Sequence, residues 1–140
     1  MQKKIPKLLL TLPLVALLTG CGSSAPPDVE IHVQQQPIPV VQGSYCWSDK
    51  CVDKIDYVSL LKETNYNTPT VSTGSKLSFD FAAQPKKDVA LHLVQNHELT
   101  EVDIQQNSFT VPKQTGTYLY VLSGRWNQGS SDYVFQIKVQ

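Results

Sequence analysis

Three cysteines are the residues whose types and spacing most clearly predict chemistry. Cys46 and Cys51 lie five positions apart, and a four-residue hairpin loop between them would bring their Cβ atoms within disulfide distance. Such a small ring would contribute roughly 2 kcal/mol to stability. We favour this structural disulfide over a redox-active pair, a metal site or two free thiols. Redox pairs use a two-residue spacing, and His92 and His97 lie about 40 residues away without the spacing of metal ligands.

The third cysteine, Cys21, follows a charged segment and then an apolar one. Residues 1–7 (MQKKIPK) are basic, and residues 8–18 (LLLTLPLVALL) form an apolar run of signal-peptide length, too short to cross a membrane. Leu18-Thr19-Gly20-Cys21 resembles the bacterial lipobox, in which the cysteine sulfur takes up a diacylglyceryl group through a thioether and cleavage precedes the cysteine. We therefore expect residues 1–20 to be a lipoprotein signal peptide and Cys21 to be the lipid attachment site. The alternative is an ordinary signal peptide with an incidental cysteine.

This lipid would hold the chain at the cell membrane, on its extracytoplasmic face. Several acyl chains make anchoring effectively permanent, because each buried CH₂ contributes about 0.8 kcal/mol. Residues 21–28, which include GSSAPP, are typical of a flexible tether, and we expect residues 29–140 to form a single domain. Removal of the leader also removes three lysines, which leaves a net charge of about −3 and excludes a basic surface for nucleic acid.

No pattern of residues predicts catalysis. The serines lack a GxSxG context, and no glycine-rich loop precedes a helix. Asp49, Asp53 and Asp56 lie at spacings of four and three and could bind Ca²⁺, but no loop resembles an EF-hand, so a solvated acidic surface is the favoured interpretation. We therefore expect a protein that is not an enzyme and that needs no cofactor or metal.

The best candidate for recognition is the segment GRWNQG, residues 124–129. Arg125, Trp126 and Asn127 have the composition of a binding loop, in which a rigid aromatic anchor lies among adaptable polar groups. The alternative is that Trp126 closes the core and the residues after it only form a turn. For Trp47, packing on the disulfide is favoured over exposure in a binding loop.

The elements that must position these residues are mainly strands, because the hydrophobic pattern has a period of two. Residues 29–33 alternate like a strand at a sheet edge, and the two prolines within residues 34–39 predict an irregular stretch. Further strands are expected near residues 77–81, 89–93, 102–104, 109–111, 118–122 and 133–139.

Seven or eight short strands predict an all-β, immunoglobulin-like antiparallel β-sandwich, and a small closed barrel is the alternative. Gly116-Thr117-Tyr118 suggests a tyrosine corner at the start of a late strand. One short helix is expected at residues 56–63 (DYVSLLKE), with Asp56 as its cap and Tyr57, Val58 and Leu61 sharing a face.

Several motifs taken together resemble a known group of proteins. The lipobox leader, QGSYCW at residues 42–47 with a second cysteine soon after, and GTYLYVLSGRWNQGSSDYVFQIKV at residues 116–139 are similar to small uncharacterised lipoproteins of spore-forming Gram-positive bacteria. The resemblance implies a cell-surface β domain and supplies no catalytic residues.

We therefore expect a membrane-anchored lipoprotein that acts as a non-enzymatic binding or accessory module for an envelope protein or polymer. One alternative is an inhibitor of secreted hydrolases that uses the loop at residues 126–129. The other is an envelope enzyme whose site is assembled from residues distant in sequence.

Overall fold

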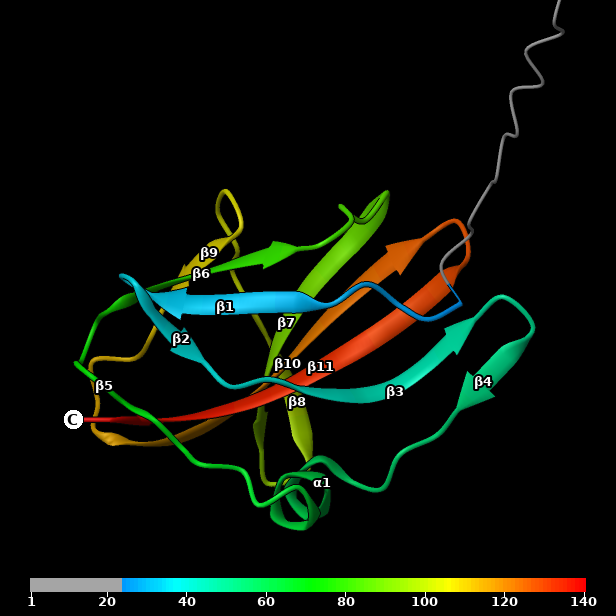
Figure 1. Cartoon of the computed structure of the whole chain (residues 1–140). Coiled ribbons are helices and arrows are strands. Elements are labelled where there is room, and N and C mark those ends of the chain that lie inside the picture. Colours follow the sequence, from blue (N-terminus) through cyan, green and yellow to red (C-terminus); the bar gives the residue numbers. More distant parts are fainter. Residues whose placement is uncertain (1–23) are drawn as a thin grey trace, which may run out of the picture.

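The computed structural model describes residues 24–140, which form two β-sheets packed face to face (Figure 1). The smaller sheet has the strand order β2-β1-β6-β9. Its members are β1 (Val29–Val33), β2 (Gln36–Ile38), β6 (Lys76–Phe81) and β9 (Ser108–Thr110). The predicted all-β antiparallel sandwich is therefore confirmed, whereas the immunoglobulin-like type stays a prediction.

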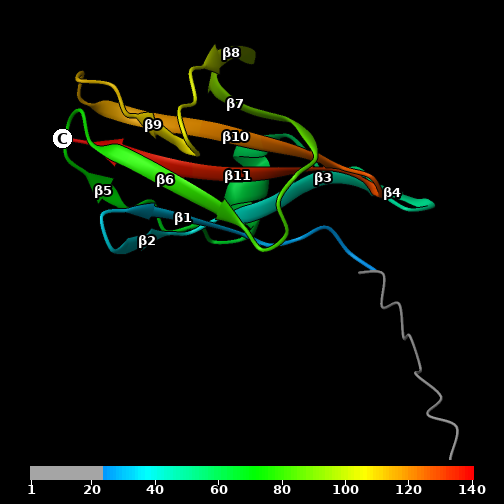
Figure 2. The same ribbon diagram turned by 90° about the horizontal axis from the view of Figure 1, so that it is seen from above.

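The larger sheet has the order β4-β3-β11-β10-β7-β8, and a short strand, β5, pairs with β11 in parallel. Its members are β3 (Val41–Trp47), β4 (Lys50–Val52), β5 (Thr70–Val71), β7 (Lys87–Gln95), β8 (Glu98–Val102), β10 (Gly116–Trp126) and β11 (Gly129–Val139). Figure 2 shows β8 at the outer margin of this sheet. Because both sheets end in edge strands, the closed-barrel alternative is wrong.

The alternation of side chains builds the core between the sheets. In β6, Leu77, Phe79 and Phe81 are buried while the residues between them are exposed. In β10, Tyr118, Tyr120 and Leu122 face this core, and the intervening Leu119 and Val121 belong to a second apolar cluster. The central strands of the larger sheet are thus buried on both faces, which requires a covering element outside the sandwich.

That covering element is the helix α1 (Tyr57–Glu63). Asp56 caps it as predicted, since its Oδ1 accepts a hydrogen bond of 3.0 Å from the backbone N–H of Ser59. The predicted buried face is only partly right, because Leu60 and Leu61 are buried whereas Val58 is 63% exposed. A helix that begins at Tyr57 directs positions 57, 60 and 61 to the sheet and turns position 58 outward.

Two predictions about the first strands are wrong. β1 is not an edge strand, because β2 pairs with it on one side and β6 on the other. Residues 34–39 are not irregular throughout, since they include β2. A three-residue edge strand tolerates Pro37, whose missing N–H leaves no gap inside the sheet.

A tyrosine corner is present where β10 begins. The hydroxyl of Tyr118 donates a hydrogen bond of 2.9 Å to the carbonyl oxygen of Gln114, four residues earlier in the chain. This bond ties the loop after β9 to the start of β10, as the sequence suggests.

The domain begins earlier than residue 29. Pro26 is buried, the Tyr133 hydroxyl donates a hydrogen bond to the carbonyl oxygen of Pro27, and the Ala82 N–H donates one of 2.9 Å to the carbonyl oxygen of Asp28. The last three residues of the predicted tether therefore pack on the sandwich. Cys21 and the predicted signal peptide lie outside the described residues. Within residues 24–140, no helix is long and apolar enough to span a membrane.

Candidate functional site

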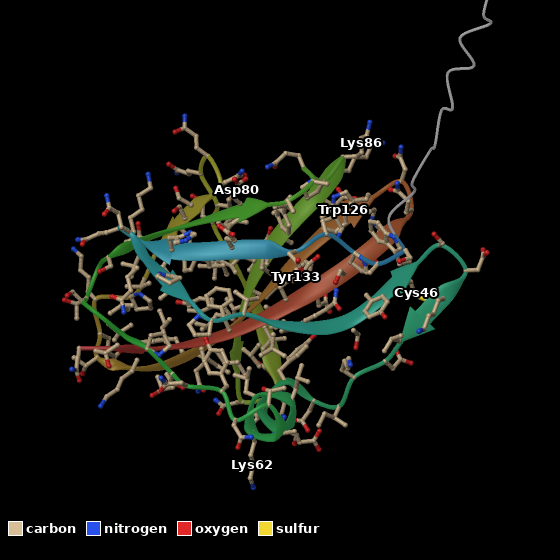
Figure 3. All side chains as sticks on the ribbon, viewed as in Figure 1. Cys46, Lys62, Asp80, Lys86, Trp126 and Tyr133 are labelled. Carbon is tan, nitrogen blue, oxygen red and sulfur yellow. A yellow bond between two sulfur atoms is a disulfide. The ribbon has the colours of Figure 1, made fainter. Side chains whose placement is uncertain are left out.

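The predicted recognition loop lacks an exposed aromatic anchor, because Trp126 belongs to the core. β10 continues to Trp126, which is only 7% exposed and whose Nε1–H donates a hydrogen bond of 2.8 Å to the carbonyl oxygen of Ala83 (Figure 3). Arg125 forms an exposed ion pair with Asp88, with 3.6 Å between Nε and Oδ2. Asn127 lies in the two-residue turn before β11. The alternative interpretation, in which Trp126 closes the core, is confirmed.

Four aromatic rings close this end of the sandwich. The ring centroids of Trp47 and Trp126 are 5.6 Å apart, those of Phe81 and Trp126 are 5.4 Å apart, and those of Phe81 and Tyr133 are 5.8 Å apart, all in edge-to-face geometry. Such pairs add about 0.5–1.5 kcal/mol each to the burial of their area. The rings therefore stabilise the fold and offer no exposed aromatic patch for a partner.

The cysteine hairpin has a shorter turn than predicted. Cys46 and Cys51 are directly opposite each other in β3 and β4, with an S–S distance of 1.96 Å and a Cα–Cα distance of 4.0 Å. Only Ser48 and Asp49 form the loop, because Lys50 already pairs with Trp47. Trp47 is buried as favoured, at 3% exposure. It points to the core rather than to the exposed disulfide, because neighbouring residues of a strand face opposite sides.

We predict that the double variant Cys46→Ser/Cys51→Ser unfolds with a free energy about 2 kcal/mol lower than the unchanged chain, since the unfolded chain loses a small covalent ring. Urea denaturation measures the difference. The reduced, unchanged chain is the control and should match the double variant. Mass mapping without reductant should find the two cysteines joined, and two alkylatable thiols in the exported protein would contradict the disulfide.

The acidic residues near the hairpin do not come together. Across residues 24–140, no group of three or more His, Cys, Asp or Glu side chains is arranged to hold a metal ion. Asp56 of the predicted trio is occupied as the cap of α1. The structure therefore gives Asp49, Asp53 and Asp56 no common site.

One depression lies beside the end of β8 and has a volume of about 420 Å³. Three of its polar residues already bond to one another: the Gln105 amide donates to the Asp103 carboxylate at 3.0 Å, and the Ser108 hydroxyl donates to the Gln105 carbonyl oxygen at 2.6 Å. This pairing leaves few groups aimed at a ligand.

A second cavity, between α1 and the β7–β8 hairpin, is the better candidate for binding. Its volume is about 230 Å³. It is lined by Asp56, Tyr57, Val58, Val94, His97 and Leu99. Val58 and Leu99 are 63% and 53% exposed, and Ile55, three residues before Val58, is a third exposed apolar side chain. We call this cavity the α1–β8 groove. Exposed apolar side chains around a hollow are the usual mark of a contact surface.

Local sequence explains how the groove is built. Asn96 and His97 both have positive φ, 50° and 65°, which is the backbone of a two-residue type I′ turn. This turn connects β7 to β8 and sets Leu99 opposite Val94. Asp56 caps α1 on the other side, so the groove lies between two short, locally defined elements.

Two consecutive residues at the start of α1, Asp56 and Tyr57, set the electrostatics of the groove. Hydrogen bonds from Ser59 hold the pKa of the Asp56 carboxyl below its usual value, with a smaller contribution from the charge of His97. Burial raises the pKa of the Tyr57 hydroxyl, and the nearby charge of Asp132 raises it further. At neutral pH the groove therefore carries a carboxylate and a neutral phenol.

Sequence reasoning missed this groove for two reasons. The prediction placed Val58 in the buried face of the helix, and it centred the strand after residue 95 on Val102 and Ile104, whereas β8 ends at Val102. The signal that could have found β8 is the polar pair Asn96-His97 between two alternating segments. Comparison of the chain with known protein families, with curated proteins and with solved structures finds no match.

Proposed function

We propose that this chain is a lipid-anchored protein of the bacterial cell envelope, held through Cys21 on the extracytoplasmic face of the cell membrane. The observation that carries the proposal is Leu18-Thr19-Gly20-Cys21 after a basic segment and an apolar run. The proposed relatives are the small lipoproteins of Gram-positive spore-forming bacteria with the same leader and GSYCW motif. The exposed disulfide supports this location, because such bonds persist outside the cytoplasm.

The short segment between Cys21 and the start of the domain limits the distance between the domain and the membrane. Pro26 is buried on the sandwich, and only residues 22–25 separate it from Cys21. Five peptide steps of about 3.5 Å allow a reach of no more than about 18 Å. A lipid on Cys21 would therefore keep the domain next to the bilayer, with the β10–β11 end of the sandwich closest to it.

We expect Cys21→Ser to abolish anchoring. Without the sulfur nucleophile, the chain should take up no acyl label and keep its leader, and it should run as a larger precursor. Metabolic labelling with a fatty acid, followed by fractionation, measures both effects. The matched control is Cys46→Ser/Cys51→Ser, which removes the other two thiols and should be labelled normally. Normal labelling of Cys21→Ser would refute the anchor.

We further propose that the domain is a non-enzymatic binding or accessory module and that the α1–β8 groove is its contact surface. The exposed Val58 and Leu99 support this proposal. The burial of Trp126 leaves the loop of the inhibitor alternative, residues 126–129, without an exposed aromatic anchor. A photocrosslinking amino acid at position 99 should form an adduct of defined mass in intact cells, while the same group at position 30, in β1, should not. Equal crosslinking at both positions would count against the groove.

A further inference from the structure

Strand β8 is the longest strand that ends either sheet. Five strands lie at sheet margins in the described part of the chain: β2, β4, the two-residue β5, β8 and β9. β2, β4 and β9 have three residues each, and β2 also contains Pro37, which cannot donate a backbone hydrogen bond. β8 has five residues, all but the last exposed, and contains neither proline nor lysine. It is therefore not protected by a very short strand, a proline or a lysine, and its only protection against pairing with another strand is the negative charge of Glu98 and Glu101.

The turn before β8 decides which of its backbone groups are free. In a hairpin with a two-residue turn, the residues that flank the turn exchange both backbone hydrogen bonds, and every second residue repeats this pattern. The flanking pair is Gln95 and Glu98. Thr100 and Val102 thus bond to β7, whereas the N–H and C=O groups of Leu99 and Glu101 point outward. These two residues offer donors and acceptors to an added strand.

The α1–β8 groove lies on the same side of the sheet as Leu99. Leu99 is opposite Val94, which packs on the apolar cluster beneath α1, and Val58 lies on the other side of the groove. A strand added to β8 would place alternate side chains on this face. An apolar side chain beside Leu99 would cover the exposed parts of Leu99 and Val58.

Charge favours one kind of occupant. Glu98, Glu101 and Asp103 give the edge and its end three carboxylates within six residues. A second copy of this chain pairing through β8 would bring like charges together, which is unfavourable across strands. A segment with lysine or arginine would instead meet opposite charges.

We propose that β8 is the docking edge for an extended, basic segment of another envelope protein, which adds a strand to the larger sheet and seats an apolar side chain in the α1–β8 groove. This mode of recognition takes affinity from backbone hydrogen bonds and specificity from the groove. The inference rests on the proposed binding function.

The test uses the full chain purified in detergent and two blocked seven-residue peptides. The probe is Thr-Lys-Thr-Val-Thr-Lys-Thr, whose lysines and valine share one face of a strand, and its matched control has glutamate in place of lysine. Titration by fluorescence anisotropy should show that the lysine peptide binds at least about tenfold more tightly than the glutamate peptide. The reason is that the carboxylates of the edge attract lysine and repel glutamate. Amide hydrogen exchange should slow at Leu99 and Glu101, while Thr100, already bonded to β7, should change little.

Substitutions in β8 test whether the lysine peptide binds at this strand. Leu99→Pro removes an outward N–H without removing a bond to β7 and should weaken binding of the lysine peptide about tenfold or more. Glu101→Lys should abolish most of the preference for the lysine peptide, because two carboxylates and one ammonium group would then remain at the edge, whereas Glu30→Lys in β1 should leave the preference unchanged. Glu101→Lys keeps the test valid if the proline variant does not fold.

Three outcomes would overturn the inference: equal affinity for both peptides, protection of amides elsewhere but not on β8, or a dimer of the chain alone that Leu99→Pro dissociates. Lipid labelling separates this inference from the anchor. A chain that carries the lipid label but does not bind the lysine peptide refutes the docking edge only. A chain that binds the peptide through β8 without carrying lipid supports the edge and refutes the proposed anchor.

Discussion

Replacing Gly129 with alanine is expected to lower the free energy of unfolding by about 4 kcal/mol, the sum of a steric and a backbone cost. A Cβ atom at this position would lie 1.9 Å from the carbonyl oxygen of Cys46 and 2.8 Å from its carbonyl carbon. The residue also has φ of 154°, a backbone conformation that side chains disfavour. Urea denaturation followed by circular dichroism measures the loss.

The clash at Gly129 is costly because the obstructing atoms are backbone atoms held on both sides. Gly129 pairs with Trp47 across β3 and β11, and the Ser48 N–H donates a hydrogen bond of 2.7 Å to the carbonyl oxygen of Gln128. Relief of the clash would separate the two strands at the end that holds the disulfide. Gly116→Ala is the matched control, since its nearest contact would be an ordinary 3.5 Å to the Tyr118 ring. Equal midpoints for the two variants would contradict the prediction.

The strands that could be predicted from the sequence are those that bury one face. Leu77, Phe79 and Phe81 alternate strictly with polar residues, and the structure places all three in the core. The helix cap at Asp56 and the tyrosine corner at Tyr118 were predictable for a similar reason, because each depends on residues within four positions of one another.

Features that depend on distant parts of the chain were not predictable. β1 reads like an edge strand because nothing in its own sequence shows that β2 will cover its outer side. The glycine and polar residues around Trp126 predict a loop, yet its indole N–H donates a hydrogen bond to the carbonyl oxygen of Ala83, 43 residues away in the sequence. The groove beside Leu99 likewise requires α1 and the β7–β8 hairpin, which are separated by more than 20 residues, to lie together.

The second large effect is expected at Trp126. Trp126→Ala should lower the free energy of unfolding by about 3–5 kcal/mol, because it removes a large buried ring and leaves a cavity. The rings of Trp47 and Phe81 would lose their edge-to-face neighbour. Trp126→Phe should cost less, because it keeps an aromatic ring and loses only volume and the hydrogen bond to Ala83. Thermal and urea unfolding of the three chains measure this order.

The control for Trp126 separates a core residue from a recognition residue. Arg125→Ala changes the neighbouring side chain, whose ion pair with Asp88 is exposed, and should alter stability by less than about 0.5 kcal/mol. Gly124→Ala should act like a weaker Trp126 variant, because its Cβ would lie 2.6 Å from the indole ring and push it outward. If Trp126→Ala unfolded at the same urea concentration as Arg125→Ala, the indole would not be a core residue, and the tip of the β10–β11 hairpin would again be a candidate for recognition.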